Sequence, residues 1–141
     1  MADCTQADIL MLLDEFILIQ LTDDSDVGSA DSDIVTRAIQ DADAEIDSYC
    51  GTRYDVPFAS ATAIIRKLSV DIAIYNLFLR RQSAPDERKE RYDNAIRFLK
   101  DVSRGNASLG ENEPAADDDD GPKASKSSSD RIYTSETLEN Y

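Results

Sequence analysis

The sequence predicts an all-α protein, built as a four-helix bundle-like domain with an extended C-terminal arm. Apolar residues recur at the three-and-four spacing of a helix in four successive segments. The links between these segments are short and rich in Asp, Ser, Gly or Pro. The periodicity stops beyond about residue 110. We therefore expect a helical domain over residues 1–110 and an acidic arm over residues 111–141.

The first predicted helix spans about Thr5 to Ile19. Thr5 is a suitable N-cap, and Asp8 lies in the first turn, where a carboxylate favours the helix dipole. Residues 21–31 are rich in Asp, Ser and Gly and indicate a surface loop. One wide apolar stripe is expected to be buried: Ile9, Leu12, Leu13, Phe16, Ile17 and Ile19.

Asp31 or Ser32 can cap the second predicted helix, which runs to about Cys50 and stops at Gly51. Pro57 predicts an extended connection over residues 52–58, because proline restricts the residue before it. The helix has a single apolar stripe: Val35, Ala38, Ile39, Ala42, Ile46 and Tyr49.

The third predicted helix, about Ser60 to Arg81, is apolar almost all the way round. A helix of this kind belongs at the centre of a fold. The fourth begins near Pro85, which suits a first helical turn, and ends at Arg104-Gly105. Four helices joined by short links are typical of a bundle.

Composition limits the chemistry that the chain can perform. The sequence contains no His, which removes Ser-His-Asp and Cys-His catalysis and the commonest metal ligand. Cys4 and Cys50 lie far apart, outside any metal-spaced motif, and we expect both to be reduced. We expect no enzyme activity and no cofactor.

Two further observations concern membrane insertion and secretion of the protein. No apolar run is long enough to span a membrane, and residues 1–20 lack the cationic start of a signal peptide. We expect a soluble, unsecreted protein with no membrane partner.

The formal net charge of −14 disfavours binding to a nucleic-acid backbone, because such binding depends on Lys and Arg. The charge is also uneven: about −12 over residues 1–60, about +4 over residues 61–110 and about −6 over the rest. The folded part is therefore electrically two-sided.

Two charged sets are candidates for a subunit interface. Our hypothesis is that the acidic set of one copy faces the basic set of a neighbour in a head-to-tail contact, which can close a ring. The alternatives are a solvated acidic face, a carboxylate metal site, a nucleic-acid patch and ordinary surface charge. The acidic set is Asp41, Asp43, Glu45 and Asp47, and the basic set is Arg88, Lys89, Arg91 and Arg97.

The loop over residues 23–33 is the one candidate metal site, since clustered carboxylates and a Gly are typical of calcium loops. The candidate ligands are Asp23, Ser25 and Asp31. Val27 at the fifth position and Ile34 at the twelfth both spoil ligand positions. We prefer a solvated loop that supplies helix caps.

The arm contains a low-complexity run over residues 111–130, including the Asp117 to Asp120 block. Such a composition cannot bury enough apolar surface to fold alone. We expect the arm to become ordered only in an assembly. Partner docking is assigned to residues that regain apolar character: Arg131, Ile132, Tyr133, Leu138 and Tyr141.

Several phrases together resemble the Mu-like phage and prophage family of small head-to-tail joining proteins, over about residues 5–110. The resemblance rests on their order and spacing, and the arm lies outside it. The phrases are Leu18-Ile19-Gln20-Leu21-Thr22-Asp23, Ala44-Glu45-Ile46-Asp47-Ser48-Tyr49, Gly51-Thr52-Arg53-Tyr54, Val56-Pro57, Arg91-Tyr92-Asp93-Asn94-Ala95-Ile96-Arg97-Phe98-Leu99 and Gly105-Asn106-Ala107-Ser108-Leu109-Gly110.

The resemblance implies a neck adaptor that forms a ring with copies of itself, commonly a dodecamer, in the virion neck. Its partners would be the portal protein above and a stopper or tail-completion protein below, with DNA only as passing cargo. Assembly would take place in the host cytoplasm. Family members often have an Asp-x-Asp-x-Asp-Gly loop where this chain has Asp23-x-Ser25-x-Val27-Gly28, which puts an inherited metal site in doubt.

The sequence leaves a second interpretation open, that of an acidic regulatory or DNA-mimic protein which covers a basic host factor. The Asp117 to Asp120 block would then carry the effect. Such a protein would stay monomeric or dimeric, whereas an adaptor would form rings or join a portal.

Overall fold

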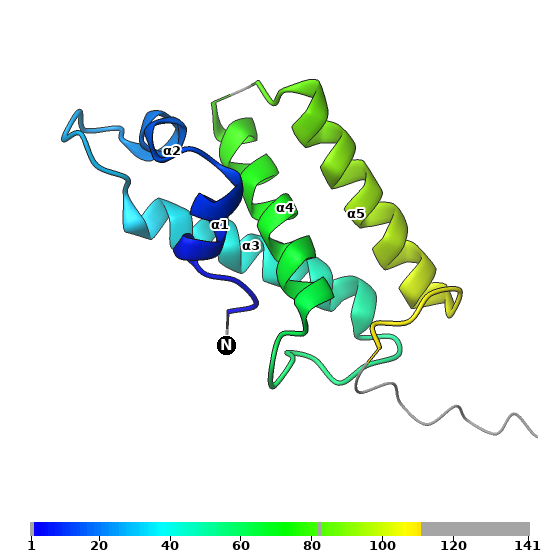
Figure 1. The fold of residues 1–141 in the computed structure, drawn as a ribbon. Coiled ribbons are helices and arrows are strands. Elements are labelled where there is room, and N and C mark those ends of the chain that lie inside the picture. The colour runs from blue at the N-terminus through cyan, green and yellow to red at the C-terminus, as the bar shows by residue number, and fades with distance from the viewer. Residues whose placement is uncertain (1, 82, 111–141) are drawn as a thin grey trace, which may run out of the picture.

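Five helices form the fold in the computed structural model, which describes residues 2–81 and 83–110 (Figure 1). No strand occurs in this part of the chain, and the predicted all-α class is confirmed. The helices are α1 (Gln6–Leu12), α2 (Glu15–Thr22), α3 (Ser32–Cys50), α4 (Ala63–Arg80) and α5 (Asp86–Arg104).

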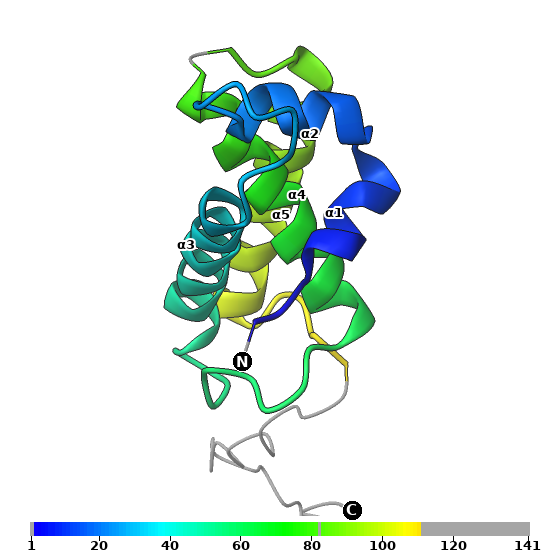
Figure 2. The same cartoon turned by 90° about the vertical axis from the view of Figure 1, so that its left-hand side faces the viewer.

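Helix α4 is the central element, as its apolar circumference predicts. It contacts all four other helices. In Figure 2, α3 and α1 lie on opposite sides of α4, and α5 lies behind it. Its buried residues cover every side of the helix: Ile65, Leu68, Ser69, Val70, Asp71, Ile72, Ala73, Ile74 and Leu77.

The single N-terminal helix predicted over residues 5–19 is wrong, because the chain forms two short helices that meet at an angle (Figures 1 and 2). Leu13 is extended, with φ −131° and ψ 129°, and ends α1. Asp14 then starts α2, since its carboxylate accepts a hydrogen bond from the Phe16 N–H at 2.8 Å. An Asp inside a helical pattern can begin a new helix as well as lie on its polar face.

This break changes which apolar residues are buried. Ile9, Leu13 and Leu18 enter the core, whereas Leu12 and Phe16 are 43% and 65% exposed. The predicted stripe assumed one continuous helix. Because the chain changes direction at Leu13-Asp14, the residues of that stripe do not all face the core.

The other helix ends follow their predicted signals closely. Asp31 caps α3 by accepting hydrogen bonds from the N–H groups of Asp33 and Ile34. Helix α4 begins at Ala63 and not near Ser60, because the Thr62 hydroxyl caps it. Gly105 ends α5 in the left-handed conformation, with φ 81°, where a side chain would be strained.

The connection between α3 and α4 secures the end of the described chain. The Tyr54 hydroxyl accepts a hydrogen bond from the Leu109 N–H at 3.2 Å, and both residues are buried. The Arg53 guanidinium donates to the Val102 carbonyl at 3.5 Å. The last described residues therefore lie against the connection between α3 and α4. The predicted arm over residues 111–141, with its docking residues Arg131, Ile132, Tyr133, Leu138 and Tyr141, lies outside the described residues.

Within the described residues, none of the helices combines the length and the apolar character that a membrane crossing requires.

Replacing Asp14 by Ala is expected to lower the free energy of unfolding by about 1 kcal/mol, because α2 loses its N-cap acceptor. Asp14→Asn keeps a side-chain oxygen and should retain most of the stability. Urea unfolding of both variants checks this. An equal loss in the two variants would show that the cap does not hold the break between α1 and α2.

Candidate functional site

The loop between α2 and α3 uses its carboxylates to hold its own backbone. The Asp23 carboxylate accepts hydrogen bonds from the Val27 N–H at 3.0 Å and from the Gly28 N–H at 2.7 Å. These two N–H groups hold the pKa of Asp23 below its ordinary value. Asp31 is engaged separately, as the cap of α3.

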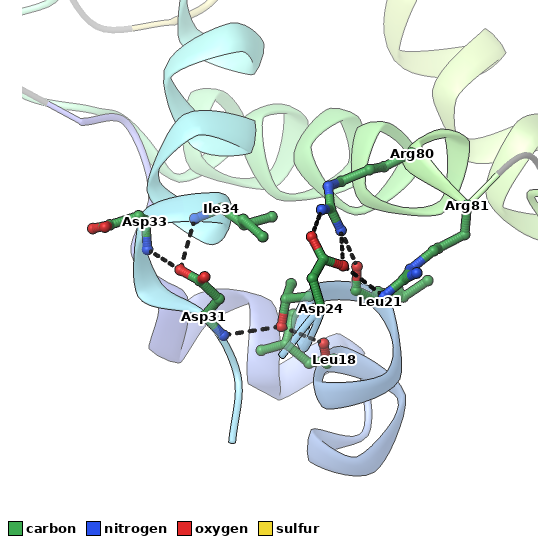
Figure 3. A network of polar contacts seen from close by, with 9 residues as sticks. Leu18, Leu21, Asp24, Asp31, Asp33, Ile34, Arg80 and Arg81 are labelled. Atoms are coloured by element: carbon green, nitrogen blue, oxygen red, sulfur yellow. Dashed lines mark hydrogen bonds and ion pairs between the residues drawn. The ribbon is translucent and has the colours of Figure 1, made fainter. Parts of the chain in front are cut away.

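The same loop is fastened to the end of α4 (Figure 3). The Asp24 carboxylate pairs with the guanidinium groups of Arg80 and Arg81, and Arg80 also donates to the Leu21 carbonyl at 2.9 Å. Hydrogen bonding to Arg80 is the main reason why the pKa of Asp24 lies below its ordinary value. The buried Thr22 links α2 to the residue before α3, because its hydroxyl donates to the Leu18 carbonyl and accepts from the Asp31 N–H.

Asp23, Ser25 and Asp31, the candidate calcium ligands, are not brought together as a ligand set. No group of three or more His, Cys, Asp or Glu side chains in the described part of the chain is arranged to hold a metal ion. The contacts of Asp23 and Asp31 are those of a loop that supplies caps and turns. The loop therefore positions α2 against α3 and α4.

The acidic candidates on α3 divide into two kinds. Asp43 lies between α3, α4 and the N-terminal segment, and accepts from the Ser69 hydroxyl at 2.8 Å and from the Asp3 N–H at 3.1 Å. Glu45 accepts from the Tyr92 hydroxyl at 2.8 Å. Asp47 is half-buried, and Asp41 is exposed.

Tyr92 is the link through which Glu45 reaches α5. Its ring stacks on that of Tyr75, with centroids 4.2 Å apart. Burial and the hydrogen bond to Glu45 raise the pKa of Tyr92 above its ordinary value, so the hydroxyl remains a donor. The hydrogen bond and the stacked rings together connect α3, α4 and α5. Glu45 therefore contributes to the packing of these three helices.

The basic candidates on α5 divide in the same way. Arg88 donates to the Leu12 carbonyl at 2.7 Å and so attaches α5 to the end of α1. Arg91 lies 3.6 Å from the buried Asp71 carboxylate and 3.4 Å from Glu87. Lys89 and Arg97 are exposed.

The eight predicted interface residues are therefore not equivalent. Asp43, Glu45, Arg88 and Arg91 have partners inside the chain, a use that charge patterning did not predict. Three of the eight are exposed and remain candidates for contacts between copies: Asp41, Lys89 and Arg97.

A buried acidic cluster at the N-terminus was missed by the sequence analysis. Asp3 is only 5% exposed and lies near Asp43 and Asp47. Burial, reinforced by these two carboxylates, raises the pKa of Asp3 to about 6. The sequence carries no signal for this burial, because it depends on the first residues crossing between α3 and α4.

The two cysteines are free, as expected, and both are buried. Burial raises the pKa of each thiol to about 11, which keeps both protonated at neutral pH. The Cys4 sulfur also lies 3.1 Å from the Ser69 hydroxyl oxygen. Both thiols belong to the core.

Asp3→Asn is expected to raise the free energy of unfolding at pH 7 by up to about 3 kcal/mol. As pH rises from 3.8 to about 6, the folded chain keeps a proton on Asp3 that the unfolded chain releases, so Asp3 progressively lowers stability over that window. The gain should therefore disappear near pH 4. Urea unfolding at both pH values measures it.

Asp8→Asn is the control of opposite sign. Hydrogen bonding to Thr5 lowers the pKa of Asp8, so its ionised form contributes stability that is lost as pH falls. This variant should be less stable than the wild type at neutral pH. A gain from Asp3→Asn that is the same at pH 4 and pH 7 would contradict the role of buried charge.

Comparison with known proteins identifies the family of the chain. The family described as Bacteriophage Mu, Gp36 matches residues 4–127, so the match continues beyond the region 5–110 that carried the resemblance. A similar protein is the Mu-like prophage FluMu protein gp36 of Haemophilus influenzae, 38% identical over 92 residues. The aligned part is 65% of this chain and spans 61% of the length of that relative. The chain is thus a phage protein that belongs to the bacteriophage Mu Gp36 family.

Proposed function

We propose that the chain is a structural head-to-tail connector, an adaptor without enzyme activity, of a tailed bacteriophage. Copies form a ring below the portal that links the capsid to the stopper or tail and lets DNA pass. The observation that carries the proposal is the family match over residues 4–127, together with the order of the sequence phrases that resemble small joining proteins.

The distribution of charge supports a ring. A ring of identical copies needs two different surfaces on each copy that complement each other. Helices α1, α2 and α3 lie in the acidic region 1–60, whereas α4 and α5 lie in the basic region 61–110. Asp41 on α3 and Lys89 and Arg97 on α5 are exposed charges of opposite sign. Contact between unlike elements of neighbouring copies would therefore be attractive.

The net charge of −14 suits passing DNA. Carboxylates repel the phosphate backbone. A surplus of carboxylates in a conduit would therefore let the duplex pass without binding to the wall. The portal above and the stopper or tail-completion protein below are the partners that this position in the virion neck entails. The ring would number twelve copies if it follows the connectors that the chain resembles.

Deleting the gene from its phage or prophage is expected to leave DNA-filled heads and free tails unjoined, as seen by electron microscopy of the lysate. Expression of the chain from a plasmid should restore joined particles, and the chain should be found in purified virions by mass spectrometry.

Joined, infectious particles in the absence of the gene would contradict the proposal. A chain that is absent from virions but captured on a basic host protein would instead favour the acidic regulatory or DNA-mimic function.

A further inference from the structure

The break between α1 and α2 leaves an apolar surface exposed. We call residues 10–16 the elbow. Met11 is 81% exposed, Phe16 is 65% exposed, and Leu10 and Leu12 are 37% and 43% exposed. Of the six large apolar side chains that are exposed in the described part of the chain, four lie in the elbow. Exposed apolar side chains concentrated in one place mark an interaction surface.

The elbow is held in place before any partner arrives. Asp14 caps α2, and Arg88 of α5 donates to the Leu12 carbonyl at 2.7 Å. Ile9, just before the elbow, and Leu13, within it, are buried in the core. A surface that is already ordered loses little conformational entropy when it binds.

A groove between α4 and α5 has the complementary character. Its volume is about 430 Å³, within the range of about 300–1,000 Å³ that is usual for pockets that hold a ligand. Apolar side chains line it together with Lys67, Asp71, Arg91 and Asn94. The apolar residues are Ile64, Leu68, Ala95 and Phe98.

The charges of the two surfaces match. The elbow carries Asp14 and Glu15, in a stretch over residues 2–30 that has seven acidic residues and no Lys or Arg. Lys67 and Arg91 lie 3.5 and 3.6 Å from the buried Asp71, and one buried Asp71 oxygen has no hydrogen-bond partner in the described structure. Arg91 also lies 3.4 Å from the exposed Glu87, so Lys67 and Arg91 are balanced locally by two carboxylates. The positive character of this side of the chain comes from the surrounding region 61–110, which is basic by about +4.

A chain cannot place its own elbow in its own groove without partly unfolding. No residue of α1 or α2 lines the groove. Moving the elbow there would break the Arg88 contact with Leu12 and expose the buried Ile9 and Leu13. The occupant has to come from another molecule, and a second copy offers an acidic apolar elbow of fixed shape.

We propose that the elbow of one copy docks in the α4–α5 groove of a second copy, with Met11 and Phe16 entering the groove and Asp14 and Glu15 facing Lys67 and Arg91. The inference deepens the proposed function and rests on it for the closure of the contact into a ring. The contact joins two different surfaces, so a copy that has received an elbow still presents its own.

The test uses the full chain and measures its mass by analytical ultracentrifugation and native mass spectrometry. The double variant Met11→Gln, Phe16→Gln should weaken self-association by a factor of about 30 or more, as expected for the loss of two anchoring side chains. Val27→Gln is the matched control, because Val27 is apolar and 74% exposed but lies outside the elbow. It should associate like the wild type.

The groove is tested by Asn94→Trp, because Asn94 is exposed and lines the groove, so a bulky side chain there blocks entry. Asn106→Trp is the control, since Asn106 is exposed and lies outside the groove. The helical circular dichroism signal and the Tm of each variant establish that it is folded. Asn94→Trp should lose self-association, and Asn106→Trp should keep it.

Mixing the two defective variants is the decisive experiment. The double elbow variant has an intact groove, and Asn94→Trp has an intact elbow, so equal amounts should form one-to-one pairs and nothing larger. Three results would overturn the inference: a wild-type chain that is monomeric at about 1 mM, a double elbow variant that associates like the wild type, or a mixture without pairs.

These outcomes are separate from a failure of the proposed function. Joined particles without the gene would reject the connector role and leave the association data unchanged. Normal self-association of the double elbow variant, with loss of portal binding, would reject the contact between copies and assign the elbow to the portal.

Discussion

The burial of α4 is the constraint on which the rest of the structure depends. Because this helix is covered on every side, four other helices have to be placed around it, and its two buried polar residues need partners. Ser69 obtains them from Asp43 and Cys4, and Asp71 from Lys67 and Arg91. The N-terminal segment contacts both α3 and α4, through Asp3 with Asp43 and Cys4 with Ser69.

The same constraint decides how much of the surface charge is available to partners. Asp43 and Arg91 contact the buried polar residues of α4. Glu45 and Arg88 make contacts between helices. A charged residue on an amphipathic helix can serve the fold as readily as an interface, and its partner within the chain distinguishes the two roles. Of the eight interface candidates, Asp41 remains exposed on α3, and Lys89 and Arg97 remain exposed on α5. These are the charges that the proposed contact between copies would use.

The N-terminal helices expose apolar side chains while the core beneath them stays intact. Ending α1 at Leu13 and restarting at Asp14 turns apolar side chains outward while the core keeps Ile9, Leu13 and Leu18. A continuous helix would bury one stripe and expose a polar face. The change of direction exposes an apolar ridge that is flanked by carboxylates and held by Arg88. Such a ridge is the kind of exposed apolar surface that a contact with another protein would bury.

The sequence by itself determined the all-α class, the three long helices and most of their ends, because apolar periodicity and caps such as Asp31 and Gly105 act within a few residues of one another. It also carried the phrases that resemble the family. Only the tertiary structure decided that Asp14 begins a helix, that Phe16 is exposed and that Asp3 is buried. These outcomes depend on contacts between residues far apart in the chain, such as Arg88 with Leu12 and Asp3 with Asp43, which no local pattern records.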